Sequence, residues 1–224
     1  MLGRKGSGKS VFAREVFRNW PDVDKLVIDP TGDADPGPDI TTHTINGRLP
    51  DSLPNPPGKG QHVTVRWIAS PQSPTYNDDL DRAVGLVLFP KHRRSLLWVD
   101  EAGEVFPAHR TGPHARTLLH QSRHWHTSAV IAGPRPMNLD PLVLAQADRV
   151  VCYDLPHPRD RERVAASIGV PPRDLARELD ITRGMGPHWF LMYVAHEHSL
   201  YRCPPLPLPP ARERARRQQP QGVA

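Results

Sequence analysis

The chain has 224 residues, a formal net charge of +5, 38% hydrophobic residues and only two cysteines. This composition is typical of a globular protein with one core of ordinary size, and no apolar run approaches the roughly 18 residues of a transmembrane helix. We therefore expect a cytoplasmic protein without a membrane span, with free thiols at Cys152 and Cys203. The positive charge permits contact with nucleic acid.

The opening stretch MLGRKGSGKS contains the pattern G-x-x-x-x-G-K-S. Glycines allow backbone N–H groups to point inward at phosphate oxygens, and the following helix adds its positive N-terminal end. Lys9 would reach the β- and γ-phosphates of ATP, and the Ser10 hydroxyl would coordinate Mg²⁺. The pattern therefore predicts a nucleotide-binding loop made of Gly3, Arg4, Lys5, Gly6, Ser7, Gly8, Lys9 and Ser10.

The first half of the chain alternates helical and strand patterns. Apolar spacing predicts a helix over 9–19, and the runs KLVIDP and HVTVRWIA predict strands over 25–30 and 62–69. The intervening residues 30–61 contain seven prolines and little periodicity, so we expect a surface insertion there without helix or strand. A helix over 77–89 follows.

The run SLLWVDEA predicts another buried strand over 95–102, with Asp100 and Glu101 near its end. The ligand of an open α/β sheet binds at the carboxyl edge of the strands, so both acids should face the phosphate loop. Asp100 would hold the Mg²⁺ shell, and Glu101 would polarise the attacking water. Together with Lys9, these acids predict ATP hydrolysis.

The second half continues the alternation. We expect helices over 111–125, 139–147 and 159–168, strands over 128–133 and 148–154, and a hairpin over 188–195 and 199–203. This order predicts one α/β domain over residues 1–203, with a mostly parallel sheet and helices on both faces. Residues 204–224 contain six prolines, so we expect a disordered tail.

Only Met1 and Leu2 precede the phosphate loop, although such a loop normally follows a central strand. Without that strand, its two neighbours would keep unpaired buried backbone groups, each costing about 1–3 kcal/mol. We therefore expect that the sequence starts too late, at an internal methionine or in a truncated gene. The upstream reading frame should then encode about four to six apolar residues, enough for an ordinary strand.

The stretch over 116–155 has a helix ending in Arg-His, a strand, an Arg-Pro pair, a helix and a strand with ADRVV. This stretch and VIDPTGD over 27–33 resemble the FtsK/HerA superfamily of DNA-pumping ATPases. The likeness covers roughly residues 1–170, and a bare core of this size is most similar to phage and viral DNA-packaging ATPases. The resemblance implies a RecA-like P-loop NTPase fold, a ring that is usually hexameric, and movement of double-stranded DNA.

The resemblance also bears on individual residues. In this family the strand after the acidic pair usually ends in Gln-Arg-Pro, and the glutamine senses the γ-phosphate. Here Pro134 takes that position, followed by Arg135 and Pro136. By resemblance, Arg123 or Arg135 would act across a subunit boundary as an arginine finger.

Three interpretations of function stay open. A DNA translocase or packaging motor, encoded by a phage or mobile element, is favoured because Lys9, Ser10, Asp100 and Glu101 are all present. A conjugative or plasmid-transfer ATPase from the same superfamily is the second. The third is a nucleotide-binding assembly protein that does not hydrolyse ATP, which Pro134 favours.

Overall fold

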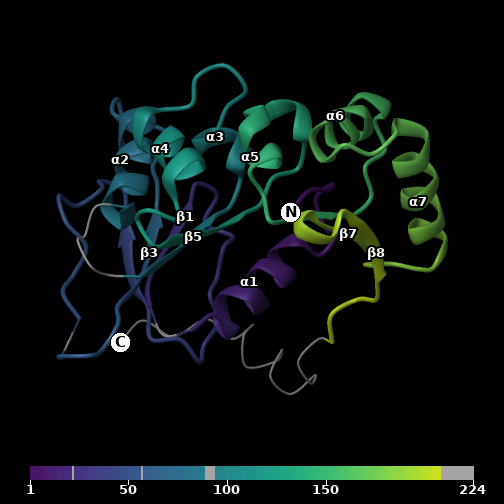
Figure 1. Ribbon diagram of the computed structural model, residues 1–224. Coiled ribbons are helices and arrows are strands. Elements are labelled where there is room, and N and C mark those ends of the chain that lie inside the picture. Colours follow the sequence, from purple (N-terminus) through teal and green to yellow (C-terminus); the bar gives the residue numbers. More distant parts are fainter. Residues whose placement is uncertain (22, 57, 89–93, 208–224) are drawn as a thin grey trace.

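The computed structural model describes residues 1–21, 23–56, 58–88 and 94–207. Its centre is a five-stranded, all-parallel sheet in the order β2-β3-β1-β4-β5 (Figure 1). The strands are β1 (Asp24–Asp29), β2 (His43–Asn46), β3 (Thr64–Ile68), β4 (Ser95–Val99) and β5 (Thr127–Ile131). The predicted mostly parallel sheet is therefore confirmed.

Helices cover both faces of this sheet, as predicted (Figure 1). The helix α1 (Lys9–Asn19) packs on one face, where Phe17 meets Trp98 with ring centroids 5.5 Å apart. The opposite face, which includes Leu26 and Leu97, packs under a group of helices. These helices are α2 (Tyr76–Leu88), α3 (Ala102–Val105), α4 (Pro113–Gln121) and α5 (Pro141–Ala145), with the 3₁₀ turn η1 (Pro136–Asn138) ahead of α5. Burial on both faces explains why β1 and β4 appear in the sequence as unbroken apolar runs.

A second sheet is antiparallel and has the order β6-β7-β8. It consists of β6 (Arg149–Cys152) and the predicted hairpin of β7 (Phe190–Val194) and β8 (Ser199–Cys203), joined by the 3₁₀ turn η2 (Ala195–Glu197). Leu191 and Tyr193 of β7 belong to the same core as the helices α6 (Pro158–Ile168) and α7 (Pro172–Gly184). Figure 1 shows this hairpin close to the N-terminus and α1.

Leu2 joins the two sheets. It forms parallel bridges to Gly133, just beyond β5, and to Cys152 of β6. Its N–H donates to the Val151 carbonyl at 2.8 Å, and its carbonyl accepts from Tyr153 N–H at 2.9 Å. The strand order therefore continues as β2-β3-β1-β4-β5-Leu2-β6-β7-β8, and Leu2 stands where the strand before the loop was expected.

The amino-terminal residue adds two further bonds to β5. The Met1 carbonyl accepts from Gly133 N–H at 3.0 Å, and its amine donates to the Ile131 carbonyl at 2.7 Å. Some of the backbone groups that we expected to be unpaired are therefore satisfied. Further along β5 toward its start, Ala129 is exposed, and β5 is the last strand of the five-stranded sheet.

Several sequence predictions need correction, and one is the strand expected over 95–102, which ends at Val99 ahead of helix α3. Residues 30–61 do contain a strand, β2, which pairs with β3 at the edge of the sheet. Helix α7 was not predicted at all, and the helix expected over 111–125 is shorter because residues 122–126 form turns. The predicted tail from residue 208 onward, and the last residue of the helix expected over 77–89, lie outside the described residues. No helix in the described part of the chain is both long and apolar enough to cross a bilayer.

Candidate nucleotide-binding site

The loop Gly3–Ser10 leaves the sheet at Leu2 and ends in the first turn of α1. Gly3 has φ 144° and Gly8, the N-cap of α1, has φ 109°, so both need the conformational freedom of glycine. A methyl group on Gly3 would lie 2.7 Å from the Cβ of Tyr153, so the loop packs closely against the exit of β6. Its sequence thus fixes both the curl of the backbone and its contact with the sheet.

The loop is closed around its own lysine. The Lys9 ammonium donates to the carbonyls of Gly3 at 2.7 Å and Arg4 at 3.0 Å. Burial lowers the pKa of Lys9, while the nearby carboxylates of Glu101 and Asp100 act in the opposite direction. The Ser7 hydroxyl is buried in the loop without a partner among the described residues. A buried donor and a cation at the centre of the loop fit an anionic phosphate group.

Asp100 and Glu101 follow β4 on the same edge of the sheet. Asp100 is only 7% exposed, and its pKa is raised to about 6, first by burial and then by the carboxylates of Asp29 and Glu101. Lys9 opposes this shift, which places the lysine and the acids in one electrostatic cluster. Glu101 has φ 53°, a left-handed conformation that is costly for a residue with a side chain and recurs at functional sites.

Sequence reasoning gave no role to the fully buried carboxylate of Asp29, which organises the loop after β1. It accepts hydrogen bonds from the backbone of Gly32 at 2.8 Å, Asp33 at 3.2 Å and Ala34 at 3.1 Å. Arg66 of β3 also donates to it, from Nε at 2.9 Å and Nη2 at 2.6 Å. The motif VIDPTGD contains Asp29, but Arg66, which pairs with its carboxylate, lies 37 residues further along the chain.

The two candidate arginine fingers lie in different surroundings. Arg123 precedes β5, at the edge of the sheet opposite the phosphate loop, and its side chain is 92% exposed beside Asp148. Arg135 lies at the loop edge and is held at 3.2 Å by the buried carboxylate of Asp160. Pro134, at the expected sensor position, has no side-chain amide to offer a phosphate.

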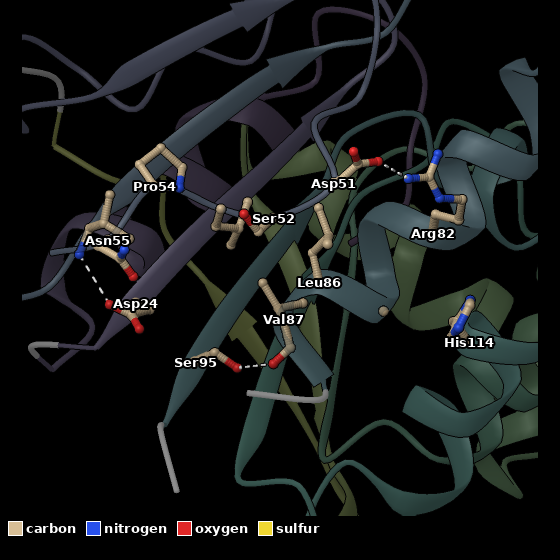
Figure 2. A pocket seen from close by; sticks show the side chains of 13 residues that line it. Asp24, Asp51, Ser52, Pro54, Asn55, Arg82, Leu86, Val87, Ser95 and His114 are labelled. Atoms are coloured by element: carbon tan, nitrogen blue, oxygen red, sulfur yellow. Dashed lines mark hydrogen bonds and ion pairs between the residues drawn. The ribbon is translucent and has the colours of Figure 1, made fainter. Parts of the chain in front are cut away.

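Two hollows mark the two edges of the sheet. One, of about 430 Å³, lies beside Glu101 and is also lined by Pro134 and Arg135. A larger one, of about 560 Å³, lies at the amino edge, where Asp24 and Ser95 begin their strands (Figure 2). None of the predicted site residues lines this larger hollow, whereas Glu101 and Arg135 line the smaller one.

A magnesium site at the loop would depend on few protein ligands. No group of three or more His, Cys, Asp or Glu side chains in the described ranges is arranged to hold a metal ion. Mg²⁺ at nucleotide sites takes one or two protein oxygens, with phosphate oxygens and water completing the octahedron. The hydroxyl of Ser10 and the carboxylate of Asp100 are oxygen ligands of this kind, so the residues present fit the ion.

A glycine-rich loop leaves the centre of a mostly parallel sheet, and its lysine lies near two acids that follow a strand two positions away. This arrangement defines a P-loop NTPase fold. No family model and no curated protein matches the chain, but solved structures do. The genome packaging NTPase B204 from Sulfolobus turreted icosahedral virus 2, in complex with ATP-gammaS, is 18% identical with a TM-score of 0.64. The match covers 91% of this chain and 94% of that one.

Two further structures give the same result. The AMP complex of the same NTPase is 19% identical, with a TM-score of 0.63 over 92% of this chain and 95% of that one. B204, the DNA-packaging ATPase from Sulfolobus turreted icosahedral virus, is 17% identical, with a TM-score of 0.59. The match covers 92% of this chain and 95% of that one. The predicted P-loop NTPase fold class is therefore confirmed along most of the chain.

Proposed function

We propose that this chain is a P-loop ATPase that moves or packages double-stranded DNA. The observation that carries the proposal is the grouping of Lys9, Asp100 and Glu101 at one edge of a sheet with the fold of genome-packaging NTPases. Acids beside a P-loop lysine are the arrangement that phosphoryl transfer to water requires. The similarity to B204, which is described as a DNA-packaging ATPase, supports DNA as the partner.

Each residue then has a distinct role. The backbone N–H groups of the loop and Lys9 hold the phosphates of ATP, and Glu101 orients and polarises the attacking water. Ser10 and Asp100 would hold Mg²⁺, which would neutralise part of the phosphate charge. We further propose that subunits form a ring, hexameric by resemblance, in which Arg123 or Arg135 reaches a neighbouring site.

Turnover of ATP, measured with and without long double-stranded DNA, tests this function. We expect DNA to raise the rate in the wild type and Glu101→Gln to abolish it, because an amide cannot act as a base. Glu162→Gln, which changes an exposed glutamate of α6, is the matched control and should keep wild-type turnover. A Glu101→Gln variant that turns over ATP normally would refute the assigned role.

A non-hydrolysing assembly protein is the second candidate, and Pro134 is the observation that favours it. Tight nucleotide binding with no turnover in the presence or absence of DNA would support this candidate. DNA-stimulated turnover would exclude this candidate. Identifying the DNA that the protein moves would then distinguish a packaging ATPase from a conjugative-transfer ATPase.

A further inference from the structure

The segment leading into β7 lies against the outer wall of the phosphate loop. His188 of this segment is exposed, yet its Nδ1 is 3.1 Å from the carbonyl oxygen of Ser7. Its φ of 63° lies in the left-handed region, which is unfavourable for histidine and is maintained only by surrounding structure. A methyl group on Gly8 would lie 3.5 Å from this same imidazole nitrogen. An exposed residue with an unfavourable backbone conformation is thus held at the loop, 181 residues away in sequence.

The strand order indicates which part of a nucleotide passes over this segment. The loop follows Leu2, and Glu101 follows β4, two strand positions away on one side. Strands in a sheet are spaced about 4.8 Å apart, so β4, which precedes Glu101, and β7, which follows His188, lie about 10 Å from Leu2 on opposite sides of it. Because the γ-phosphate must face Glu101, the nucleoside end must emerge on the opposite side, over β6 and the start of β7.

The hydrogen bond to Ser7 fixes the form of the imidazole. A carbonyl oxygen only accepts, so Nδ1 of His188 must carry the proton and donate. In the neutral ring Nε2 is then a hydrogen-bond acceptor, and it lies on the side of the ring away from the loop. An acceptor at this place matches the exocyclic amino group of adenine, which is a donor.

We propose that His188 is a specificity residue for the purine base, with Nε2 accepting a hydrogen bond from the 6-amino group. The proposal rests on the nucleotide binding proposed above and adds the part of the ligand that is recognised. One neutral hydrogen bond corresponds to about a three- to tenfold difference in affinity.

The test compares two ligands that differ only at this group, ATP and purine riboside triphosphate, which has hydrogen in place of the amino group. Equilibrium binding is measured by calorimetry with Mg²⁺ in a Glu101→Gln background, so that no ligand is consumed. We expect ATP to bind about three- to tenfold more tightly. In His188→Asn we expect both ligands to bind equally.

Asparagine is chosen because it tolerates the left-handed conformation and can keep a donor to the Ser7 carbonyl while lacking Nε2. His196→Asn is the matched control, since His196 is exposed at the far end of β7 and should leave the ATP preference unchanged. A preference for ATP that persists in His188→Asn, or no preference in the parent, overturns the proposal. Failure of both ligands to bind the parent would instead overturn nucleotide binding itself.

Discussion

Replacing Asp100 with asparagine should stabilise the nucleotide-free protein at neutral pH, although Asp100 belongs to the proposed site. The carboxylate is 7% exposed and has Asp29, Glu101 and Asp33 as charged neighbours, which outweigh the favourable effect of Lys9. Its pKa is therefore raised from 3.8 to about 6. A shift of this size corresponds to about 3 kcal/mol of lost stability when the group is ionised.

The pH dependence follows from the direction of the shift. The folded state binds the Asp100 proton more tightly than the unfolded chain does, so the free energy of unfolding falls as pH rises from about 4 to about 6. Above pH 6 the full loss remains, whereas below pH 4 both states are protonated and the loss disappears. The variant Asp100→Asn lacks this titration, so its advantage should grow from near zero at pH 4 to about 3 kcal/mol at pH 7.5.

Urea unfolding followed by tryptophan fluorescence, in EDTA and without nucleotide, measures this difference at several pH values. Asp51→Asn is the matched control because its side chain is 93% exposed, and its stability should stay within about 0.5 kcal/mol of the wild type. An Asp100→Asn protein no more stable than the wild type at pH 7.5 would refute the reasoning. So would an advantage that does not change with pH.

Two further predictions concern groups around the site. Gly3→Ala should lower the free energy of unfolding by about 2–4 kcal/mol, because the added methyl group would lie 2.7 Å from Tyr153 Cβ. The control Gly6→Ala places its methyl group within 4 Å of nothing and should cost only about 1 kcal/mol, from backbone strain. Equal losses for the two variants in thermal unfolding would contradict this. Arg66→Ala removes the cation from the buried carboxylate of Asp29 and should cost about 3–5 kcal/mol in urea unfolding, and a loss below about 1 kcal/mol would contradict the pairing.

The parts of the fold that depend on local pattern could be predicted from the sequence. The runs at β1 and β4 are apolar at successive positions because both faces of these strands are buried, and the acids that follow them mark the carboxyl edge. The loop and α1 were predictable because glycine, lysine and serine at fixed spacing are demanded by phosphate geometry. These local signals placed Lys9, Asp100 and Glu101 at the same edge.

Elements that depend on distant partners could not be predicted in the same way. The strand β2 is mostly exposed and lies in a proline-rich segment, and it exists because β3 offers a free edge. Helix α7 did leave a signal that was not used, since Leu175 and Leu179 are spaced four apart after Pro172 at its start. The role of Asp29 depends on Arg66 in another strand, which no local pattern reveals.

The two residues before the loop illustrate what cannot be learned by counting backbone hydrogen bonds. Counting backbone groups predicted unpaired strands on both sides of the loop, but it could not show that Leu2 and Met1 would bridge them. A single residue has one N–H and one C=O, and here the two bonds of Leu2 go to β6 while the neighbouring Met1 completes the contact with β5. The connection between the sheets thus rests on very few backbone bonds.

Several unfavourable features of this molecule lie where the ligand is proposed to bind. Lys9 is coordinated by carbonyls of its own loop, the Ser7 hydroxyl has no partner among the described residues, and Asp100 is ionised in a buried acidic cluster. Glu101 and His188 both hold left-handed conformations. A bound triphosphate would accept hydrogen bonds from the first two groups, and its Mg²⁺ would neutralise the third. Ligand binding should therefore offset the costs of these three groups, so removing the Asp100 charge should stabilise the protein only in the absence of nucleotide.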